Sequence, residues 1–311
     1  MSPGSMLADR SLRARRVDRS DPSRELFVAQ AFGLRWSSDH PLVQFRPDKE
    51  SGPADVQVRR VENLCDRAGG RVVNNGVVFA DGARFRFRDA VFDTFGAGRV
   101  DWWCPHGHEM PSAFYGTVAA IILAWRGLVP LHGSSVEIGG RAIMVVGPSG
   151  AGKSTLCHAL VERGGRLVSD DLTAMMTMAR PGEPMLQPGR HAIRMVSPSG
   201  MPGDDKLLQR AVSVDPDRLV PLAAMVVLGD PPIPSGPAHA CEMLARQLFR
   251  PQWMQALPFG RERSATLLHA APRIVIFTAP AATDPSMMPV EEKAERVMAR
   301  FGSIISHRLG Q

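Results

Sequence analysis

The stretch GPSGAGKS (147–154) constrains the fold of this 311-residue chain more than any other. It fits the pattern G-x-x-x-x-G-K-S, in which glycines turn backbone N–H groups toward phosphate oxygens, the lysine reaches the β and γ phosphates, and the serine hydroxyl can bind Mg²⁺. The flanks agree, because RAIMVV (141–146) reads as a buried strand and STLCHALVER (154–163) as a helix whose N-terminus faces the anion. The sequence therefore predicts a strand–loop–helix unit that binds a nucleoside triphosphate.

Two aspartates, Asp170 and Asp171, follow the next expected strand, which begins after Gly164-Gly165. A strand–helix–strand crossover is right-handed and makes its two strands parallel, so both strands end at the sheet edge where ligands bind. We therefore expect both carboxylates beside the phosphate loop. One carboxylate suffices to hold Mg²⁺, and the second predicts a group near an incoming hydroxyl. The alternative is that one of the pair only caps a turn.

Other polar residues around this unit are weaker candidates. His132 lies in VPLHGSSVEI (129–138), and we expect its strand to lie beside the strand of the loop through a turn at Gly139-Gly140. A structural role remains the alternative for this histidine. Phosphoryl transfer also needs cations on the moving oxygens. Downstream candidates are Arg190, Arg194, Lys206 and Arg210, of which Arg194 (on an expected strand) and Lys206 are favoured, with surface charge as the competing explanation.

The N-terminal part has a different character. Residues 1–24 hold six arginines against three aspartates, or +3 of the net +6, and few apolar residues, which predicts a disordered basic tail. Residues 25–105 read as an antiparallel β lobe with tight turns at Asn75-Gly76 and Asp81-Gly82. In RFRFR (84–88), the phenylalanines should face a core and the arginines should face solvent or an acidic peptide. A helix is expected at 111–127, an exposed loop at 229–239, and an amphipathic helix at 290–305.

Composition excludes several classes of protein. No apolar run has the length of a membrane span, and the N-terminus lacks a secretory signal. Four cysteines without paired spacing indicate reduced thiols in a cytoplasmic protein. Outside the tail a net charge of only +3 is spread over the chain, which argues against a nucleic-acid partner. CPHGHEM (104–110) lacks the paired spacing of a zinc site.

The segment LHGSSVEIGGRAIMVVGPSGAGKSTLCHALVERGGRLVSDDL (131–172) resembles the core of HPr kinase/phosphorylase and related P-loop serine kinases. The resemblance implies an α/β kinase fold related to phosphoenolpyruvate carboxykinase, about 129–311, after an N-terminal β-rich lobe at 25–128. It also implies transfer of the γ-phosphate of ATP to a serine hydroxyl, with Mg²⁺. The implied catalytic residues are His132, Lys153, Asp170 and Arg194. Ser154 and Asp171 are the implied metal ligands, although the roles of the two aspartates could be reversed. The implied nucleotide-binding residues are Gly147, Ser149, Gly150, Ala151, Gly152, Lys153, Ser154, Thr155 and Lys206.

The chain departs from those kinases in two places. The longer signature that HPr kinases carry downstream of the aspartates is missing, and the N-terminal lobe differs, which puts HPr itself and the reverse reaction in doubt. The pattern AFGL…SSDHPL…ADV is closer to shorter HPr-kinase-like proteins, some of which phosphorylate a serine of a ribosomal, lasso-type precursor peptide. The expected partner is thus a peptide or small protein, and a homo-oligomer is left open. The rival functions are a small-molecule kinase and a nucleotide-gated binding module.

Overall fold

The computed structural model describes residues 26–50, 52–105, 109–177, 182–196, 206–229, 236–282 and 288–309. The expected basic tail, 1–24, lies outside these residues, as do His106 and His108 of the CPHGHEM motif. No helix within the described ranges is both long and apolar enough to cross a bilayer.

The N-terminal part forms one nine-stranded sheet with the strand order β3-β1-β2-β4-β9-β8-β7-β6-β5. The strands are β1 (Phe27–Ala31), β2 (Leu34–Ser38), β3 (Arg46–Pro47), β4 (Val56–Arg60), β5 (Arg71–Val73), β6 (Gly76–Phe79), β7 (Gly82–Phe87), β8 (Ala90–Phe95) and β9 (Arg99–Trp103). The expectation of a purely antiparallel sheet is wrong, because β4 pairs in parallel with both β2 and β9. A parallel pair needs a crossover rather than a hairpin, and residues 39–55 and 61–98 provide these two crossovers.

Both expected tight turns lie one residue earlier than the dipeptides suggested. Val73 pairs with Gly76, and Phe79 pairs with Gly82, so each glycine is the first residue of a strand. The reason is close backbone approach. A Cβ on Gly76 would lie 2.0 Å from the carbonyl oxygen of Arg84, and one on Gly82 would lie 1.9 Å from that of Thr94. The glycines are therefore needed by the neighbouring strand and not by the turn itself.

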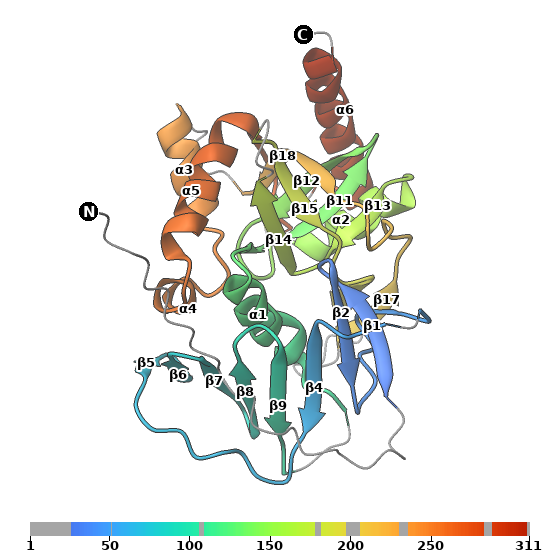
Figure 1. Cartoon of the computed structure of the whole chain (residues 1–311). Helices are drawn as coiled ribbons and strands as arrows, with labels where there is room; N and C mark the ends of the chain where they lie inside the picture. The colour runs from blue at the N-terminus through green and yellow to red at the C-terminus, as the bar shows by residue number, and fades with distance from the viewer. Residues whose placement is uncertain are drawn as a thin grey trace, which may run out of the picture.

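A buried helical segment joins this sheet to the rest of the chain. A π-helical turn at Phe114–Val118 leads into α1 (Ala119–Trp125), within the predicted helix. The helix ends before Gly127, whose φ is 78°. Figure 1 shows α1 between the nine-stranded sheet and a second sheet. The core around α1 also includes Leu172 and Trp253, so residues distant in sequence complete it.

The second sheet has eight strands in the order β10-β14-β15-β18-β12-β11-β13, with β19 beside β18. The strands are β10 (Val129–His132), β11 (Ser134–Ile138), β12 (Arg141–Val146), β13 (Arg166–Ser169), β14 (Leu172–Thr177), β15 (Pro184–Gln187), β18 (Val220–Leu228) and β19 (Val275–Ala279). A separate antiparallel pair is formed by β16 (Ala192–Val196) and β17 (Lys206–Arg210).

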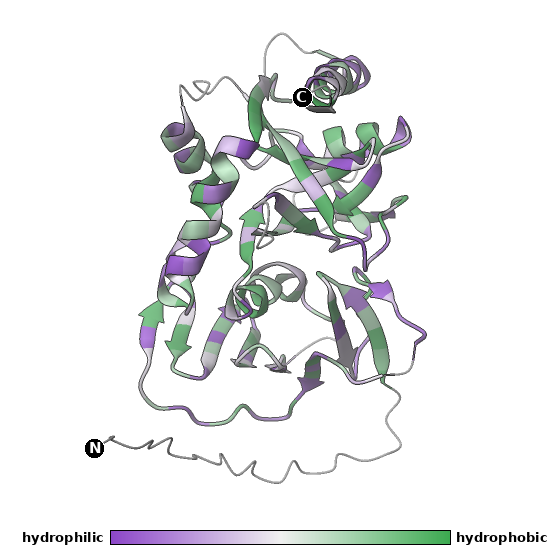
Figure 2. Ribbon diagram, turned by 45° about the horizontal axis from the view of Figure 1, so that its top comes forward, coloured by the Kyte–Doolittle hydropathy of each residue, from purple (hydrophilic) through white to green (hydrophobic). Residues whose placement is uncertain are grey.

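Helices cover both faces of this sheet, as the alternation along β12 requires. Ala142, Met144 and Val146 pack in the core shared with α3 and α5, whereas Ile143 and Val145 pack in the core shared with α2 and α6. Figure 2 shows apolar strands between helices of mixed polarity. The helices are α2 (Lys153–Glu162), α3 (Pro237–Ala245), α4 (Pro251–Ala256), α5 (Gly260–Ala270) and α6 (Val290–Leu309), with a 3₁₀ turn at Ala271–Arg273.

Two predictions at the C-terminal end have different outcomes. The last amphipathic helix is confirmed as α6, and Ala294, Val297 and Phe301 of its predicted stripe are buried. The predicted loop at 229–239 is wrong at its end, because Pro237 begins α3. Proline is well suited to a first helical position, where its missing N–H has no intrahelical partner. Residues 230–235 of that loop lie outside the described residues.

Candidate active site

The glycine-rich loop connects the end of β12 to the start of α2. Gly147, Gly150 and Gly152 all have positive φ, at 149°, 83° and 91°, which favours glycine. A Cβ on Gly147 would lie 3.1 Å from the carbonyl oxygen of Leu228, and one on Gly152 would lie 3.0 Å from Cβ of Ala282. Because α2 begins at Lys153, its first N–H groups open toward the space enclosed by the loop. Backbone geometry thus explains why this stretch needs its glycines.

The strand carrying His132 has a different neighbour from the one expected. The expected strand is interrupted at Gly133, so that β10 ends at His132 and β11 begins at Ser134. A Cβ on Gly133 would lie 3.0 Å from the carbonyl oxygen of Val145. β11 pairs with β12 as predicted, but β10, which ends at His132, pairs with β14 instead. The expectation that the histidine strand lies beside the loop strand is therefore wrong for His132 itself.

The acidic pair lies at the edge of the sheet that carries the loop. β11 is antiparallel to both β12 and β13, so those two strands run in the same direction, as expected, with β11 between them. Asp170 and Asp171 directly follow β13, and β14 then starts at Leu172. Asp171 has a φ of 65°, which lets adjacent side chains leave the backbone in different directions. The structure thus brings the two carboxylates and the loop together.

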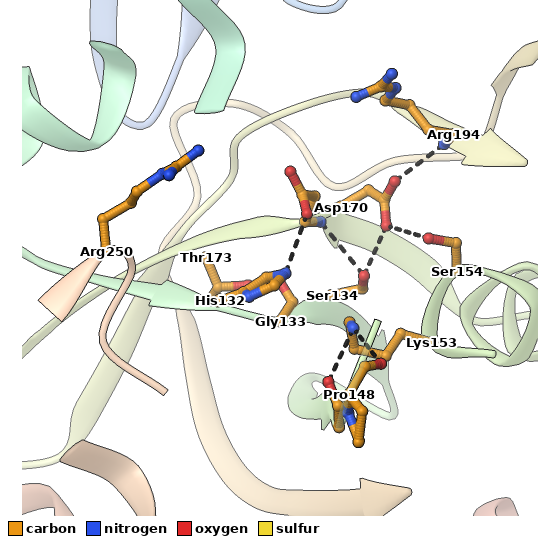
Figure 3. A network of polar contacts seen from close by, with 12 residues as sticks. His132, Gly133, Ser134, Pro148, Lys153, Ser154, Asp170, Thr173, Arg194 and Arg250 are labelled. Atoms are coloured by element: carbon orange, nitrogen blue, oxygen red, sulfur yellow. Dashed lines mark hydrogen bonds and ion pairs between the residues drawn. The ribbon is translucent and has the colours of Figure 1, made fainter. Parts of the chain in front are cut away.

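Asp170 faces the loop. Its side chain is fully buried. Its Oδ1 accepts hydrogen bonds from Ser134 Oγ at 2.6 Å and from Ser154 Oγ at 3.1 Å, while its Oδ2 accepts one from the backbone N–H of Arg194 at 2.9 Å (Figure 3). A carboxylate fixed by three donors is rigidly placed next to the loop serine.

Asp171 faces the opposite way, toward His132. Its Oδ1 lies 3.3 Å from His132 Nε2, and its Oδ2 lies 3.4 Å from Nη1 of Arg190. Burial alone would raise the pKa of this carboxyl, but the hydrogen bond with His132 and the charge of Arg190 hold the pKa well below its ordinary value. Asp171 is therefore ionised at neutral pH. Since its side chain is 38% exposed, it also remains accessible.

Arg190 is the buried cation of this site. Its side chain is 1% exposed, and burial lowers the pKa of the guanidinium from its usual value. Nε donates to the carbonyl oxygen of Tyr115 at 3.0 Å, and Nη2 donates to the same oxygen. Tyr115 lies in the π-helical turn beside α1. Arg190 consequently connects the segment between the two sheets to Asp171.

A cleft of about 180 Å³ lies at this edge of the sheet, and the buried side chains of Asp170 and Arg190 do not line it. The predicted residues that line it are His132, Ser149, Gly150, Gly152, Lys153, Ser154, Thr155, Asp171 and Arg194. Gly147 and Ala151 shape the loop without lining the cleft, and Lys153 Nζ donates to the carbonyl oxygens of Gly147 at 2.9 Å and Pro148 at 3.0 Å. For Lys206 the structure describes only the backbone, which pairs with Val196 on β16, so its role stays a prediction.

The sequence reasoning missed two residues here and passed over a third. The sequence pattern did not single out Ser134, although it lies two residues after His132. Arg250 was also missed, and Figure 3 shows it pointing toward the region of His132 and the aspartates. Its Nε donates to Thr117 Oγ1 at 3.2 Å. Arg190 was one of four candidate cations, and only the fold distinguishes it from the others.

The donor set suits a magnesium ion. Ser154 Oγ and Asp170 Oδ1 are hard oxygen ligands, and Mg²⁺ is usually bound by one or two such groups together with substrate phosphates and water. Among the described residues no cluster of three or more His, Cys, Asp or Glu side chains could hold a metal. The residues present therefore fit an ion that binds together with a phosphate ligand.

The described part of the chain thus has an α/β fold in which a glycine-rich loop and two carboxylates share one sheet edge. Residues 127–184 match the family described as HPr Serine kinase C-terminal domain. The HPr kinase/phosphorylase of Chlorobium phaeobacteroides (strain BS1) is 46% identical over 63 residues, or 20% of this chain and 18% of that protein. The HPr kinase/phosphorylase of Treponema pallidum (strain Nichols) is 52% identical over 44 residues, or 14% of each.

Together these matches support an HPr kinase-like family for this chain. The chain spans less than a fifth of the length of either curated relative. Among solved structures, the HPr(Ser) kinase/phosphatase from Coxiella burnetii aligns with a TM-score of 0.26 and 21% identity, covering 35% of this chain and 66% of the other.

Proposed function

We propose that this chain is an ATP- and Mg²⁺-dependent kinase that transfers the γ-phosphate to a serine hydroxyl of a peptide or small protein. One observation carries the proposal: the adjacent carboxylates of Asp170 and Asp171 face different partners, the loop serine Ser154 and the exposed His132. A metal-binding group and a separate proton acceptor are what phosphoryl transfer to an alcohol requires. The matches to HPr kinase/phosphorylases support the same reaction class.

In this proposal the loop and the start of α2 bind the triphosphate. The backbone N–H groups of the loop surround the phosphates, and Lys153 leaves the carbonyl oxygens of its own loop to contact the β and γ phosphates. Ser154 and Asp170 would hold Mg²⁺, which offsets charge on the phosphates when bound. This reverses the assignment that the sequence favoured, because Asp170 and not Asp171 contacts the loop serine.

Asp171 and His132 would then handle the proton of the acceptor. The serine oxygen forms a bond to the γ phosphorus while the bond from that phosphorus to the β–γ bridging oxygen breaks, and ADP leaves. The serine proton moves to Oδ1 of Asp171, beside His132 Nε2, and is released to water. His132 is 47% exposed, so the pair can reach an incoming hydroxyl. Arg194 lines the cleft and is our candidate for stabilising charge on the moving phosphoryl group.

The acceptor is proposed here only by its chemistry. A serine in a peptide or small protein, such as a ribosomal precursor peptide, is the leading candidate, and a small-molecule alcohol is the rival within the same mechanism.

The four cysteines are all free thiols, which favours a reducing cytoplasmic location.

The test uses the full chain with γ-labelled ATP and Mg²⁺. The probes are peptide pools of random sequence around one fixed serine, the matched pools with threonine or alanine at that position, and free small alcohols such as serine and glycerol. We expect label in the serine pool, none in the alanine pool, and none when EDTA replaces Mg²⁺. Label only in the small alcohols would favour the rival kinase. ATP binding without transfer to any probe would contradict the proposal and favour a nucleotide-gated binding module.

A further inference from the structure

A second open space lies on the nine-stranded sheet, outside the candidate active site. It measures about 470 Å³ and is lined by Asn75, Gly76, Val77, Arg84, Arg86 and Arg88, which we call the arginine groove. Phe85 and Phe92 of the neighbouring strands β7 and β8 pack in the core with α1. Because side chains alternate along a strand, Arg84 and Arg86 lie on the opposite face of the sheet, away from α1. The groove is therefore on an outer surface.

The three arginines of the groove do not have the same role. Arg84 is bound to the buried carboxylate of Asp93, with Nε–Oδ1 and Nη2–Oδ2 distances of 2.8 and 2.6 Å, and it also donates to the carbonyl oxygen of Cys65. Arg84 therefore faces outward as expected, but its guanidinium is paired with Asp93 and its side chain is only 28% exposed. Arg86 and Arg88 are exposed, and Arg86 has no ion pair among the residues that the structure describes. Arg84 thus supports the groove, while Arg86 and Arg88 supply its accessible charge.

The chemistry of the lining defines what could bind. No carboxylate lines the groove, and the nearest acidic residue along the chain, Asp89, shares the turn after β7 with Arg88. An apolar area lies beside the charge. Val77 lines the groove, and its cross-strand partner Val72, on the terminal strand β5, is 80% exposed. A ligand that satisfies both areas carries carboxylates and at least one aliphatic side chain.

We propose that the arginine groove docks an acidic, partly aliphatic segment of the polypeptide acceptor, with carboxylates on Arg86 and Arg88 and an aliphatic side chain on Val72 and Val77. This deepens the proposed function and rests on it, because it states which polypeptides the kinase would select. The tail of the chain itself, residues 1–24, is a poor occupant because it carries +3. Opposite charges across such a surface increase the association rate and the selectivity for a partner.

The first test measures binding without nucleotide, so it does not depend on catalysis. The probe is a fluorescent peptide of glutamates interrupted by valines, and its control has glutamine at every glutamate position. Anisotropy should report binding of the glutamate peptide alone. The double variant R86E/R88E should weaken it about tenfold, the effect of losing two partly exposed ion pairs. The matched control R246E/R261E changes exposed arginines elsewhere and should stay within about twofold.

Three results would overturn the proposal. The first is that the glutamine peptide binds as tightly as the glutamate peptide, and the second is that R86E/R88E and R246E/R261E lose the same affinity for the glutamate peptide. The third is that a single-stranded oligonucleotide binds equally tightly with the same dependence on the variants, which would define a general polyanion site. Thermal melts should show that both double variants are folded, because R86E/R88E leaves the Arg84–Asp93 pair in place and R246E/R261E loses, among the described residues, only the exposed Arg246–Glu242 pair. A changed melt in R86E/R88E alone would require repeating the test with Arg86→Gln.

The second test connects the groove to transfer. A serine peptide joined to the glutamate–valine segment should have a lower KM than the serine peptide alone, with kcat unchanged, and R86E/R88E should remove this advantage. Binding of the acidic peptide without phosphoryl transfer would contradict the proposed function but not the binding role of the groove. Transfer with the same KM for both serine peptides would contradict the groove proposal alone.

Discussion

Asp171, at the edge of the second sheet, and Asp101, in the nine-stranded sheet, are two carboxylates whose pKa values shift in opposite directions. Burial raises the pKa of Asp101, and Arg99, whose Nη2 lies 3.3 Å from Asp101 Oδ2, does not compensate for it. At Asp171 burial acts in the same direction, but His132 and Arg190 outweigh it and lower the pKa. Oδ1 of Asp101 has no hydrogen-bond partner among the described residues, whereas Oδ1 of Asp171 lies beside His132 and Oδ2 lies beside Arg190.

This difference separates an organised site from an ordinary buried charge. Enclosure by itself disfavours ionisation, so a carboxylate that must stay charged needs partners fixed in place. Asp171 receives one of them from β10 and the other from Arg190, next to β16. Its environment is built from distant parts of the chain, whereas Arg99 lies two residues from Asp101 on the same strand.

The largest expected effect is on the rate of phosphoryl transfer, which should depend on Asp171 but not on Asp101. Asp171→Asn should lower phosphoryl transfer about 10²- to 10⁴-fold, because it removes the proton acceptor, while ATP affinity changes little. Asp101→Asn should leave the rate unchanged. Both rates are measured with γ-labelled ATP and the serine peptide pool. Wild-type transfer by Asp171→Asn would contradict the role proposed for this carboxylate.

The next effect concerns ATP binding. Lys153→Ala should weaken ATP binding about ten- to a hundredfold, because it removes a charged donor to the phosphates. Lys49→Ala, at an exposed lysine in the N-terminal half, is the matched control and should bind ATP normally. Isothermal titration of ATP in the presence of Mg²⁺ measures both. Equal affinities would mean that the phosphates bind elsewhere.

A third experiment removes the cation beside each carboxylate. Arg190→Met should lower the free energy of unfolding by about 2 kcal/mol, because Tyr115 loses charged donors and Asp171 loses a charged partner. The depressed pKa of Asp171 gives stability that is present above the unfolded pKa of about 4 and is lost as pH falls through the folded pKa. Since the variant raises that folded pKa, acid unfolding should begin at a higher pH. Urea titrations across acid pH measure both effects.

Arg99→Met should lower the free energy of unfolding by less than Arg190→Met does, because Arg99 is 39% exposed. Equal losses of unfolding free energy in Arg190→Met and Arg99→Met would contradict the expected difference between the two arginines.

The smallest effect comes from neutralising Asp101. Its raised folded pKa means that the stability linked to its protonation is complete below the unfolded pKa and is lost as pH rises through the folded pKa. Asp101→Asn should therefore be neutral or slightly stabilising at pH 7, by less than about 1 kcal/mol. In urea titrations, the free energy of unfolding should differ less between pH 4 and pH 7 for Asp101→Asn than for the wild type. A large loss at pH 7 would mean that the Arg99 pair outweighs burial.

The parts of the fold that the sequence predicted depend on local patterns. The strand, loop and helix around residues 141–163 are found as expected, because glycine conformations and apolar periodicity are local properties. The edge position of Asp170 and Asp171 followed from the direction of the crossover. What failed depends on distant pairing. Neither the break at Gly133 nor the parallel pairs of β4 has a local signal, because each is fixed by a strand distant in sequence.

The same limit applies to the site residues. Arg190 had no feature that set it apart from Arg194 or Arg210, since its importance comes from Tyr115, 75 positions away. Ser134 could have been found, because a serine beside the histidine in LHGSS (131–135) can reach the same sheet edge. Arg250 had no such signal.

The contact between Arg190 and Tyr115 has a consequence for any shortened form of this protein. The family-matched stretch, 127–184, includes the loop, His132 and both aspartates, but neither Arg190 nor Tyr115. A fragment trimmed to that stretch would retain most of the recognisable signature and the contact of Asp171 with His132, but it would lose the buried Arg190 that also favours the ionised form of Asp171. The unit that preserves the full environment of Asp171 is therefore larger than the stretch that the family match covers.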